Sequence, residues 1–277
     1  MNDTNNGNTA LVKPAGGDDP TRALARFLDA RSKGLAKFAA SRVKPETLIR
    51  LAVFEFSQNE WLRRCTPESI YASLILSAQI GLEPSGIKGE AYLVPFKGKC
   101  TLIPGWRGLV KLALRSKAVK SLYSHIVYEE DEFYVDLGSE PKVHHRPNID
   151  RDERTPIRCA YAVAHMENGS IDVEVMTLSE LKYIRDMASK TRGGKDGPAY
   201  TDWEDQMYRK APIRRLCKRL PLGDDFFIAA KADELGEIGE SEKLNGFIMD
   251  AEVVGEPVSA GDALTEKIAA KAREIAG

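Results

Sequence analysis

The chain has 277 residues, of which 43% are hydrophobic and 29% are charged, a composition typical of a globular protein with one large domain and a small appendage, or with two domains. Its four cysteines are widely spaced and form no C-x-x-C pair, which argues against a zinc site and against a disulfide framework. No apolar run reaches the roughly 18 residues that a membrane span needs, and the polar N-terminus lacks the apolar segment of a signal peptide. We therefore expect a soluble, cytoplasmic protein with no membrane partner.

The net charge of −1 conceals a strong asymmetry along the chain. Residues 224–277 carry 13 acidic and 5 basic side chains, a net charge of −8, whereas residues 1–223 carry 35 basic and 28 acidic side chains, a net charge of +7. A basic body followed by an acidic tail is the distribution expected of a nucleic-acid-binding protein whose tail regulates it or binds another protein.

The N-terminal third is predicted to be helical after a disordered arm. Residues 1–19 are polar and rich in Gly, Asn and Asp, the composition of a disordered segment. Helical patterns follow at residues 20–32, 45–58 and 67–80. The last of them has Thr66 at its N-cap, Pro67 in its first turn and Gly81 just past its end. Trp61, and Trp203 further along the chain, are expected to anchor the core.

The stretch from Lys97 to Lys120 holds seven basic residues and no acidic one. It begins at the turn of a predicted hairpin over residues 90–104, where Lys97 and Lys99 flank a glycine. A helix is predicted from Trp106, and basic residues at four-residue spacing form one row along its surface. That row consists of Arg107, Lys111 and Arg115, with Lys117 following. A hairpin tip and a helix face of a single charge sign form a surface suited to a polyanion.

Three aromatic residues lie among these cations, namely Tyr92, Phe96 and Trp106. Bases of a single-stranded nucleic acid stack well on such side chains, particularly beside Lys and Arg. The alternation along the hairpin strands equally allows some of them to pack in the core. Both roles remain open for each residue.

The middle of the chain is predicted to form strands, at residues 122–128, 133–137, 158–166 and 171–176. The last two form a hairpin that closes on Asn168-Gly169, a strong turn signal. Thr177 and Glu180 have the spacing of a capping box, which opens a helix that runs to about Met187. The following loop, residues 189–198, is rich in Gly, Lys and Arg, and such loops often become ordered when a ligand binds.

A second basic stretch, from Gln206 to Gly223, has six basic residues and again no acidic one. One row at four-residue spacing contains Lys210, Arg214 and Lys218, and Arg215 and Arg219 form the adjacent row. We expect these rows to face outward, opposite the apolar residues of the same helix. Pro212 lacks an amide donor, so the helix should start or kink there. Helices are thus predicted at residues 200–209, 213–220 and 225–234, followed by a linker at 236–261 and a short helix at 263–275.

Catalytic and metal-binding patterns are weak in this sequence. No G-x-x-x-x-G-K-[ST] motif is present, which argues against ATP-driven chemistry. A nuclease centre could be drawn through Asp172, Glu180 and Lys182, although the last two lie on a predicted helix. The acidic run 129–132 could bind a divalent ion such as magnesium, or form a solvated turn. His144 and His145 are adjacent, so their side chains should diverge rather than share a metal.

Several separated motifs resemble the RecT family of phage and prophage single-strand annealing proteins, and the resemblance covers roughly residues 20–225. The N-terminal motifs are Gly81–Pro84, Gly89–Phe96, Trp106–Val110 and Val127–Phe133. The C-terminal ones are Trp203, Met207, Lys210, Arg214, Lys218 and Leu220–Pro221. One departure is Ala211, where the family more often has Thr.

The resemblance implies a mixed α+β fold, with a small antiparallel sheet backed by helices, whose protomers assemble into rings or helical filaments. It implies ATP-independent annealing of complementary DNA strands in phage-type recombination within a bacterial host cell, without a required cofactor. It also implies that the acidic C-terminal region binds a partner, such as a host single-strand-binding protein or a phage exonuclease. The alternatives are a metal-dependent phage nuclease and a DNA-binding protein that does not anneal.

We accordingly divide the chain into an arm at residues 1–19, a DNA-binding, annealing and oligomerisation core at 20–235, and a tail at 236–277. The predicted DNA-binding residues are the basic and aromatic side chains of the two basic stretches. They are Tyr92, Phe96, Lys97, Lys99, Trp106, Arg107, Lys111, Arg115, Lys117, Lys210, Arg214, Arg215 and Lys218.

Overall fold

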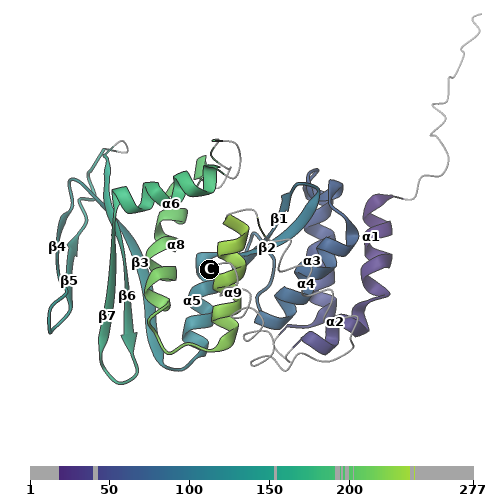
Figure 1. Cartoon of the computed structure of the whole chain (residues 1–277), viewed down its shortest axis with the longest axis horizontal. Coiled ribbons are helices and arrows are strands. Elements are labelled where there is room, and N and C mark those ends of the chain that lie inside the picture. Colours follow the sequence, from purple (N-terminus) through teal and green to yellow (C-terminus); the bar gives the residue numbers. More distant parts are fainter. Residues whose placement is uncertain are drawn as a thin grey trace, which may run out of the picture.

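The computed structural model describes residues 19–39, 43–152, 155–190, 194, 196, 200–201, 203–237 and 240. Within these residues the fold is α+β, with small antiparallel sheets and helices packed around them (Figure 1). The predicted arm, most of the predicted linker and the predicted C-terminal helix lie outside the described residues. All four cysteines are buried as free thiols. Every helix in the described part of the chain is too short or too polar to span a bilayer.

The N-terminal helices pack around one fully buried helix. These elements are α1 (Pro20–Asp29), α2 (Ser32–Phe38), α3 (Pro45–Gln58), the 3₁₀ turn η1 (Leu62–Arg64) and α4 (Pro67–Ile80). Every residue of α4 from Ser69 to Ile80 is buried. Its ends confirm the predicted signals, because the Ser69 amide donates to the Thr66 hydroxyl and Gly81 adopts the left-handed φ of +67°. The helix predicted at 20–32 ends earlier, and the sequence prediction missed α2.

The predicted basic hairpin is confirmed as β1 (Ala91–Phe96) and β2 (Lys99–Pro104). Its two-residue turn has positive φ at both positions, +47° at Lys97 and +76° at Gly98. This is the backbone of the hairpin turn that usually requires Asn, Asp or Gly, so a lysine is an unusual occupant of the first position.

Helix α5 (Trp106–Arg115) follows directly and lies against the segment before β1. A Cβ on Gly105 would stand 2.3 Å from the Gly89 carbonyl oxygen, and a Cβ on Gly108 would stand 2.0 Å from the Glu90 carbonyl oxygen. Both glycines are therefore required by close backbone approach, which fixes residues 89–90 on the first turn of α5.

A three-stranded antiparallel sheet forms the other half, in the order β3 (Val119–Tyr128), β6 (Ile157–Met166) and β7 (Ile171–Thr177). Its inner face packs on helices through residues such as Ala160 and Met176. Its outer face is covered by the hairpin β4 (Glu132–Asp136) and β5 (Lys142–Arg146), which contributes Phe133, Val135 and Val143. The sequence prediction missed β5, in which exposed and half-buried residues alternate.

Three helices complete the described fold: α6 (Leu178–Lys190), α8 (Glu204–Cys217) and α9 (Asp224–Glu237). The capping box that opens α6 is confirmed, because the Glu180 amide donates to the Thr177 hydroxyl at 3.3 Å and the Thr177 amide donates to Glu180 at 2.9 Å. A helix start at Pro212 is wrong, since α8 begins eight residues earlier and contains the proline.

Figure 1 shows how these parts follow one another along the molecule. The β4–β5 hairpin lies at one end, next to the three-stranded sheet, and α6 and α8 cover the inner side of that sheet. Helices α5 and α9 occupy the middle, and β1–β2 with α1–α4 form the other end. One hydrophobic cluster runs from Leu24 of α1 to Leu235 of α9, so α9 belongs to the core, although our division ends at residue 235, inside its last turn.

We predict that Gly108→Ala destabilises the fold by about 1–3 kcal/mol, because the added methyl group would overlap the Glu90 carbonyl oxygen and approach Leu82 at 2.9 Å. The matched control is Gly86→Ala, where nothing lies within 4 Å, and we expect a change within about 0.5 kcal/mol. Urea denaturation measures both. Equal stabilities for the two variants would contradict the close approach of residues 89–90 to α5.

Candidate nucleic-acid interface

The cations at the β1–β2 tip are exposed to solvent. Lys97 and Lys99 are both exposed, and the Lys97 ammonium lies 5.2 Å from the centre of the half-buried Phe96 ring. Tyr92, on β1, exposes 43% of its surface. A Cβ on Gly89 would touch the Tyr92 hydroxyl at 3.2 Å and the Arg107 Cδ at 3.4 Å, so these two side chains gather beside the same loop.

The predicted row on α5 divides into three environments. Arg107 is exposed and lies over the Trp106 ring. Lys111 is 40% exposed and forms an ion pair with Glu90 at 2.7 Å. Arg115 turns inward, where its guanidinium donates to the Ile80 and Gly81 carbonyl oxygens at the C-terminus of α4 and pairs with Asp225 at 3.3 Å. The expectation of an outward-facing Arg115 is therefore wrong, because this side chain satisfies the last carbonyls of a buried helix.

The outward-facing row predicted on α8 is also wrong for two of its three members. Lys210 is buried and paired with Asp233 of α9, and Arg214 bonds the second oxygen of the same carboxylate at 3.1 Å. The Asp233 side chain has no exposed surface. These cations therefore join α8 to α9 in this structure and do not reach the surface. Lys218, just past the helix, is exposed as predicted.

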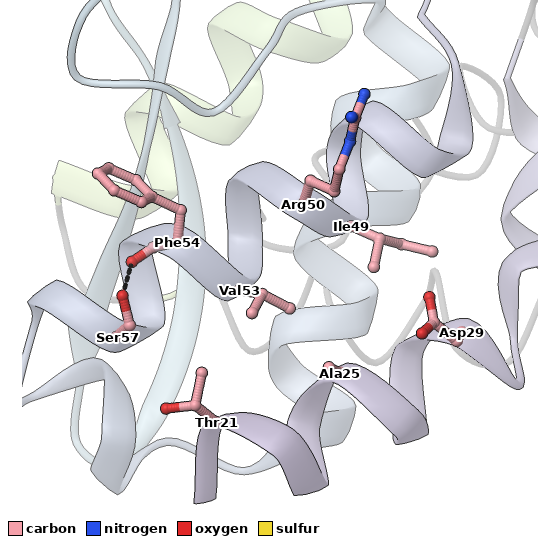
Figure 2. Close-up of a pocket in the computed structure, with 8 residues that line it drawn as sticks. All are labelled: Thr21, Ala25, Asp29, Ile49, Arg50, Val53, Phe54 and Ser57. Atoms are coloured by element: carbon pink, nitrogen blue, oxygen red, sulfur yellow. Dashed lines mark hydrogen bonds between the residues drawn. The ribbon is translucent and has the colours of Figure 1, made fainter.

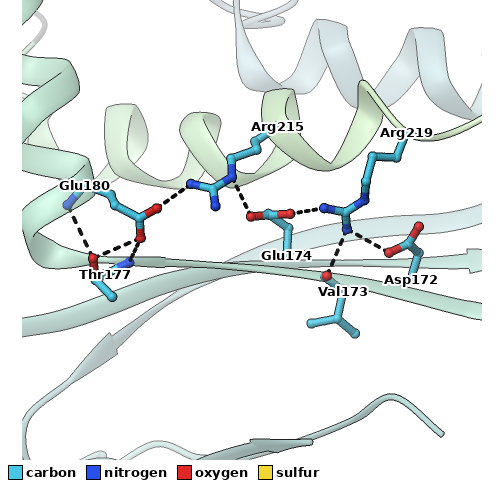
Figure 3. A network of polar contacts seen from close by, with 7 residues as sticks. All are labelled: Asp172, Val173, Glu174, Thr177, Glu180, Arg215 and Arg219. Atoms are coloured by element: carbon cyan, nitrogen blue, oxygen red, sulfur yellow. Dashed lines mark hydrogen bonds and ion pairs between the residues drawn. The ribbon is translucent and has the colours of Figure 1, made fainter. Parts of the chain in front are cut away.

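Arg215 and Arg219 form a ladder with the carboxylates of β7 and α6 (Figure 3). Arg215 pairs with Glu174 at 2.7 Å and with Glu180 at 2.5 Å, while Arg219 pairs with Glu174 and, at 2.8 Å, with Asp172. The hydrogen bond from Arg215 is the main cause that lowers the pKa of the Glu180 carboxyl to about 2. Arg215 remains 47% exposed, but its charge is already neutralised.

The same ladder contains the two carboxylates through which a nuclease centre could be drawn in the sequence. Asp172 and Glu180, the two carboxylates of that pattern, are paired with arginines. In the acidic run after β3, Asp131 points inward and accepts hydrogen bonds from the Tyr128 and Asn148 amides. Within the described residues, no three His, Cys, Asp or Glu side chains are grouped so that they could hold a metal ion.

The two histidines of β5 diverge, as predicted. His144 is half-exposed and stacks on Tyr134, whereas His145 is buried between Asp131 and the Tyr161 hydroxyl, each at 3.1 Å. His145 thereby ties the β4–β5 hairpin to the three-stranded sheet.

The three tryptophans lie in different environments. Trp106 is half-buried and its indole N–H donates to Gln206 at 2.9 Å, which joins α5 to α8. Trp61 and Trp203 each expose 64% of their surface, so the expectation that they anchor the core is wrong. Trp61 lies beside η1, next to the hairpin tip, and neither it nor the neighbouring Arg63 and Arg64 was among the predicted residues. The adjacent Trp-Leu-Arg-Arg in the sequence was a signal that could have found them.

A shallow groove of about 310 Å³ lies between α1 and α3, at the N-terminal end of the molecule (Figure 2). Its lining is mainly apolar, with one acidic and one basic side chain at the rim. The lining residues are Thr21, Ala25, Asp29, Ile49, Arg50, Val53, Phe54 and Ser57. This groove contains none of the predicted binding residues, and its balanced charge does not favour a polyanion.

Apart from Arg215, whose charge the ladder neutralises, the exposed members of the predicted set lie at the hairpin tip, at both ends of α5 and at the end of α8. We call them the exposed basic set: Tyr92, Lys97, Lys99, Arg107, Lys117 and Lys218. Cations and aromatic rings on adjoining elements are the surface chemistry that nucleic-acid-binding proteins use.

Comparison with known proteins identifies the family. The RecT family model matches residues 46–245, and this chain belongs to the RecT family, which places it among recombination proteins and confirms the resemblance of its motifs. Protein RecT of Escherichia coli strain K12 is 36% identical over 208 residues, which cover 72% of this chain and 75% of that protein. The uncharacterized protein YqaK of Bacillus subtilis strain 168 is 26% identical over 106 residues, 38% of this chain and 34% of that protein.

We predict that Asp233→Ala destabilises the protein by about 3–5 kcal/mol, because it leaves the buried Lys210 and the largely buried Arg214 without their shared carboxylate. Glu234→Ala, one residue away and half-exposed, should change stability by no more than about 0.5 kcal/mol. Chemical denaturation of both variants measures the difference. A loss below about 1 kcal/mol for Asp233→Ala would contradict a structural role for the ion group.

Proposed function

We propose that this protein binds single-stranded DNA and anneals complementary strands without hydrolysing a nucleotide, in homologous recombination of the phage type. Membership of the RecT family supports the proposal, and the observation that carries it is the exposed basic set at the hairpin tip and on α5. The sequence pattern for nucleotide binding, G-x-x-x-x-G-K-[ST], is missing from the whole chain.

The proposed mechanism is electrostatic and positional. Lys97, Lys99 and Arg107 bind phosphates and release condensed counterions, which reduces the repulsion between two strands. Contacts to phosphates fix the path of the strand but read no sequence, so the bases remain available for pairing. Complementarity between the strands then supplies the specificity, and the protein binds sequences of any kind.

Backbone conformation supports a functional role for two of the lysines. Among the described residues other than glycine, only Lys97 and Lys117 have positive φ, +47° and +59°. A residue other than Gly, Asn or Asp in this left-handed conformation costs about 1–2 kcal/mol. Such strained conformations are found most often at functional sites. Both lysines belong to the exposed basic set. A need for a positive charge at these two positions would explain why lysine is present there despite the cost in stability.

Assembly and partners extend the proposal. Protomers of this chain would assemble side by side into rings or helical filaments along the DNA. The acidic tail at residues 236–277 would bind a protein partner, either a host single-strand-binding protein or a phage exonuclease. Its charge of opposite sign would also compete with DNA for the basic surface.

We predict that wild-type protein binds oligo(dT) with an affinity that falls as salt rises, and that each lost phosphate contact lowers the slope of log K against log[salt] by about 0.7. Lys97→Gln/Lys99→Gln should therefore lower the slope by about 1.4. The control is Lys142→Gln on β5, where the side chain is 69% exposed at the opposite end of the molecule (Figure 1). Fluorescence anisotropy across a salt series gives the slopes. Equal slopes for all three proteins would place the DNA contacts elsewhere.

We further predict that the protein accelerates pairing of two complementary oligonucleotides in the absence of ATP, because phosphate neutralisation requires no energy source. A fluorescence-quenching assay measures the rate, with and without ATP, and phosphate release is measured in parallel. Binding without acceleration would identify a DNA-binding protein that does not anneal. Degradation of either strand in magnesium would instead favour the nuclease alternative.

A further inference from the structure

An exposed tryptophan lies next to the basic hairpin tip. Trp61 exposes 64% of its surface, and the Arg64 guanidinium stands over its ring, 4.5 Å from the ring centre. Arg64 also forms an ion pair with Glu60 at 2.7 Å. Arg63, between them, is exposed. The indole and the two arginines form a small patch of aromatic and cationic character.

Contacts of the backbone place this patch beside the lysines of the tip. The Thr66 amide, just after η1, donates to the Gly98 carbonyl oxygen in the hairpin turn at 3.1 Å. A Cβ on Gly98 would lie 4.0 Å from the Arg64 carbonyl oxygen. The short turn that follows Trp61 and includes Arg64 therefore lies against the hairpin tip, although more than thirty residues separate the two in the sequence.

The segment that carries Trp61 is held firmly. The Asn59 side chain accepts hydrogen bonds from the Trp61 amide at 2.9 Å and from the Leu62 amide at 3.3 Å. Leu62 is only 1% exposed and anchors the turn in the core. The Cys65 thiol donates to the Trp61 carbonyl oxygen at 3.5 Å. A rigid turn thus presents the indole to solvent, and a ligand that stacks on it loses little conformational entropy of the protein.

The chemistry of the patch selects an unpaired nucleobase. An exposed indole lacks the burial that normally stabilises tryptophan, and stacking on a base provides that burial in proteins that bind single strands. The neighbouring cations suit the phosphates on either side of that base. The nearby Glu60 carboxylate is paired with Arg64, while Arg63 and Lys97 are exposed.

We propose that Trp61 is a base-stacking subsite: its indole holds one unpaired base of a single strand, while Lys97 and Lys99 bind the adjoining phosphates. This inference rests on the proposed function and adds to it a contact that depends on the base and not on the phosphate. A subsite of this kind keeps one base unstacked from its neighbours at the hairpin tip.

The test compares two oligonucleotides of equal length and phosphate number, one of dT and one of abasic sites. Trp61→Ala should raise the Kd for oligo(dT) about tenfold and leave the Kd for the abasic oligonucleotide unchanged. Trp61→Phe retains a stacking ring and should recover most of the affinity for oligo(dT). The matched control is Trp203→Ala, since Trp203 is equally exposed but lies beside the acidic Glu204 and Asp205 at the start of α8. This control should bind both oligonucleotides as wild type does.

The outcomes separate this inference from the function on which it rests. If wild type binds oligo(dT) with the expected salt dependence but Trp61→Ala matches it, only the stacking subsite is overturned. An equal loss on both oligonucleotides, or a loss that Trp61→Phe does not recover, would assign Trp61 a structural role and overturn it as well. Wild-type protein that binds neither oligonucleotide would overturn the subsite and the proposed function together.

Discussion

Asp233 lies between Lys210 and Arg214 with no exposed surface, and this buried carboxylate determines how the C-terminal half of the protein can pack. Helix α8 and the residues after it carry six cations and no acid from residue 206 to 223, yet Ile213 and Leu216 must be buried in the core. An unpaired charge cannot accompany them into the interior, because its desolvation is too costly. Three neighbouring elements therefore supply carboxylates: α9 gives Asp233, while β7 and α6 neutralise the arginines of the ladder.

Because of this constraint, the two basic stretches, which have similar patterns in the sequence, lie in different environments in the structure. Four cations of the second stretch pair with carboxylates of α9, β7 and α6, whereas Lys218 is exposed. The cations of the hairpin tip and of the first turn of α5 remain at the surface, because their elements are anchored by glycine contacts and by apolar burial. The exposed cations of the first stretch therefore gather at the hairpin tip and at the start of α5.

Features encoded by neighbouring residues could be predicted from the sequence. The ends of α4, the turns of the β1–β2 and β6–β7 hairpins and the capping box of α6 depend on residues within a few positions of one another, and all were predicted. The missed elements lack such signals: α2 has no side-chain N-cap, and β5 presents one weak alternation of valine and histidine. The direction in which Lys210 points depends on Asp233, 23 residues later, and no periodicity within α8 reveals that partner. Trp61 was misplaced because tryptophan is usually buried, and the two arginines that follow it at residues 63 and 64 are the local signal of an exposed turn.

The left-handed backbone at Lys97 and Lys117 has a consequence for engineering and for sequence variation among relatives. Selection for heat resistance alone would favour Gly or Asn at both positions, because these residues adopt such conformations at little cost. A library sorted by melting temperature would therefore enrich chains that fold better but lack these two exposed charges. The residue at these two positions in a relative is therefore informative. A relative that keeps Lys or Arg there, at a cost to its stability, is under selection for the positive charge.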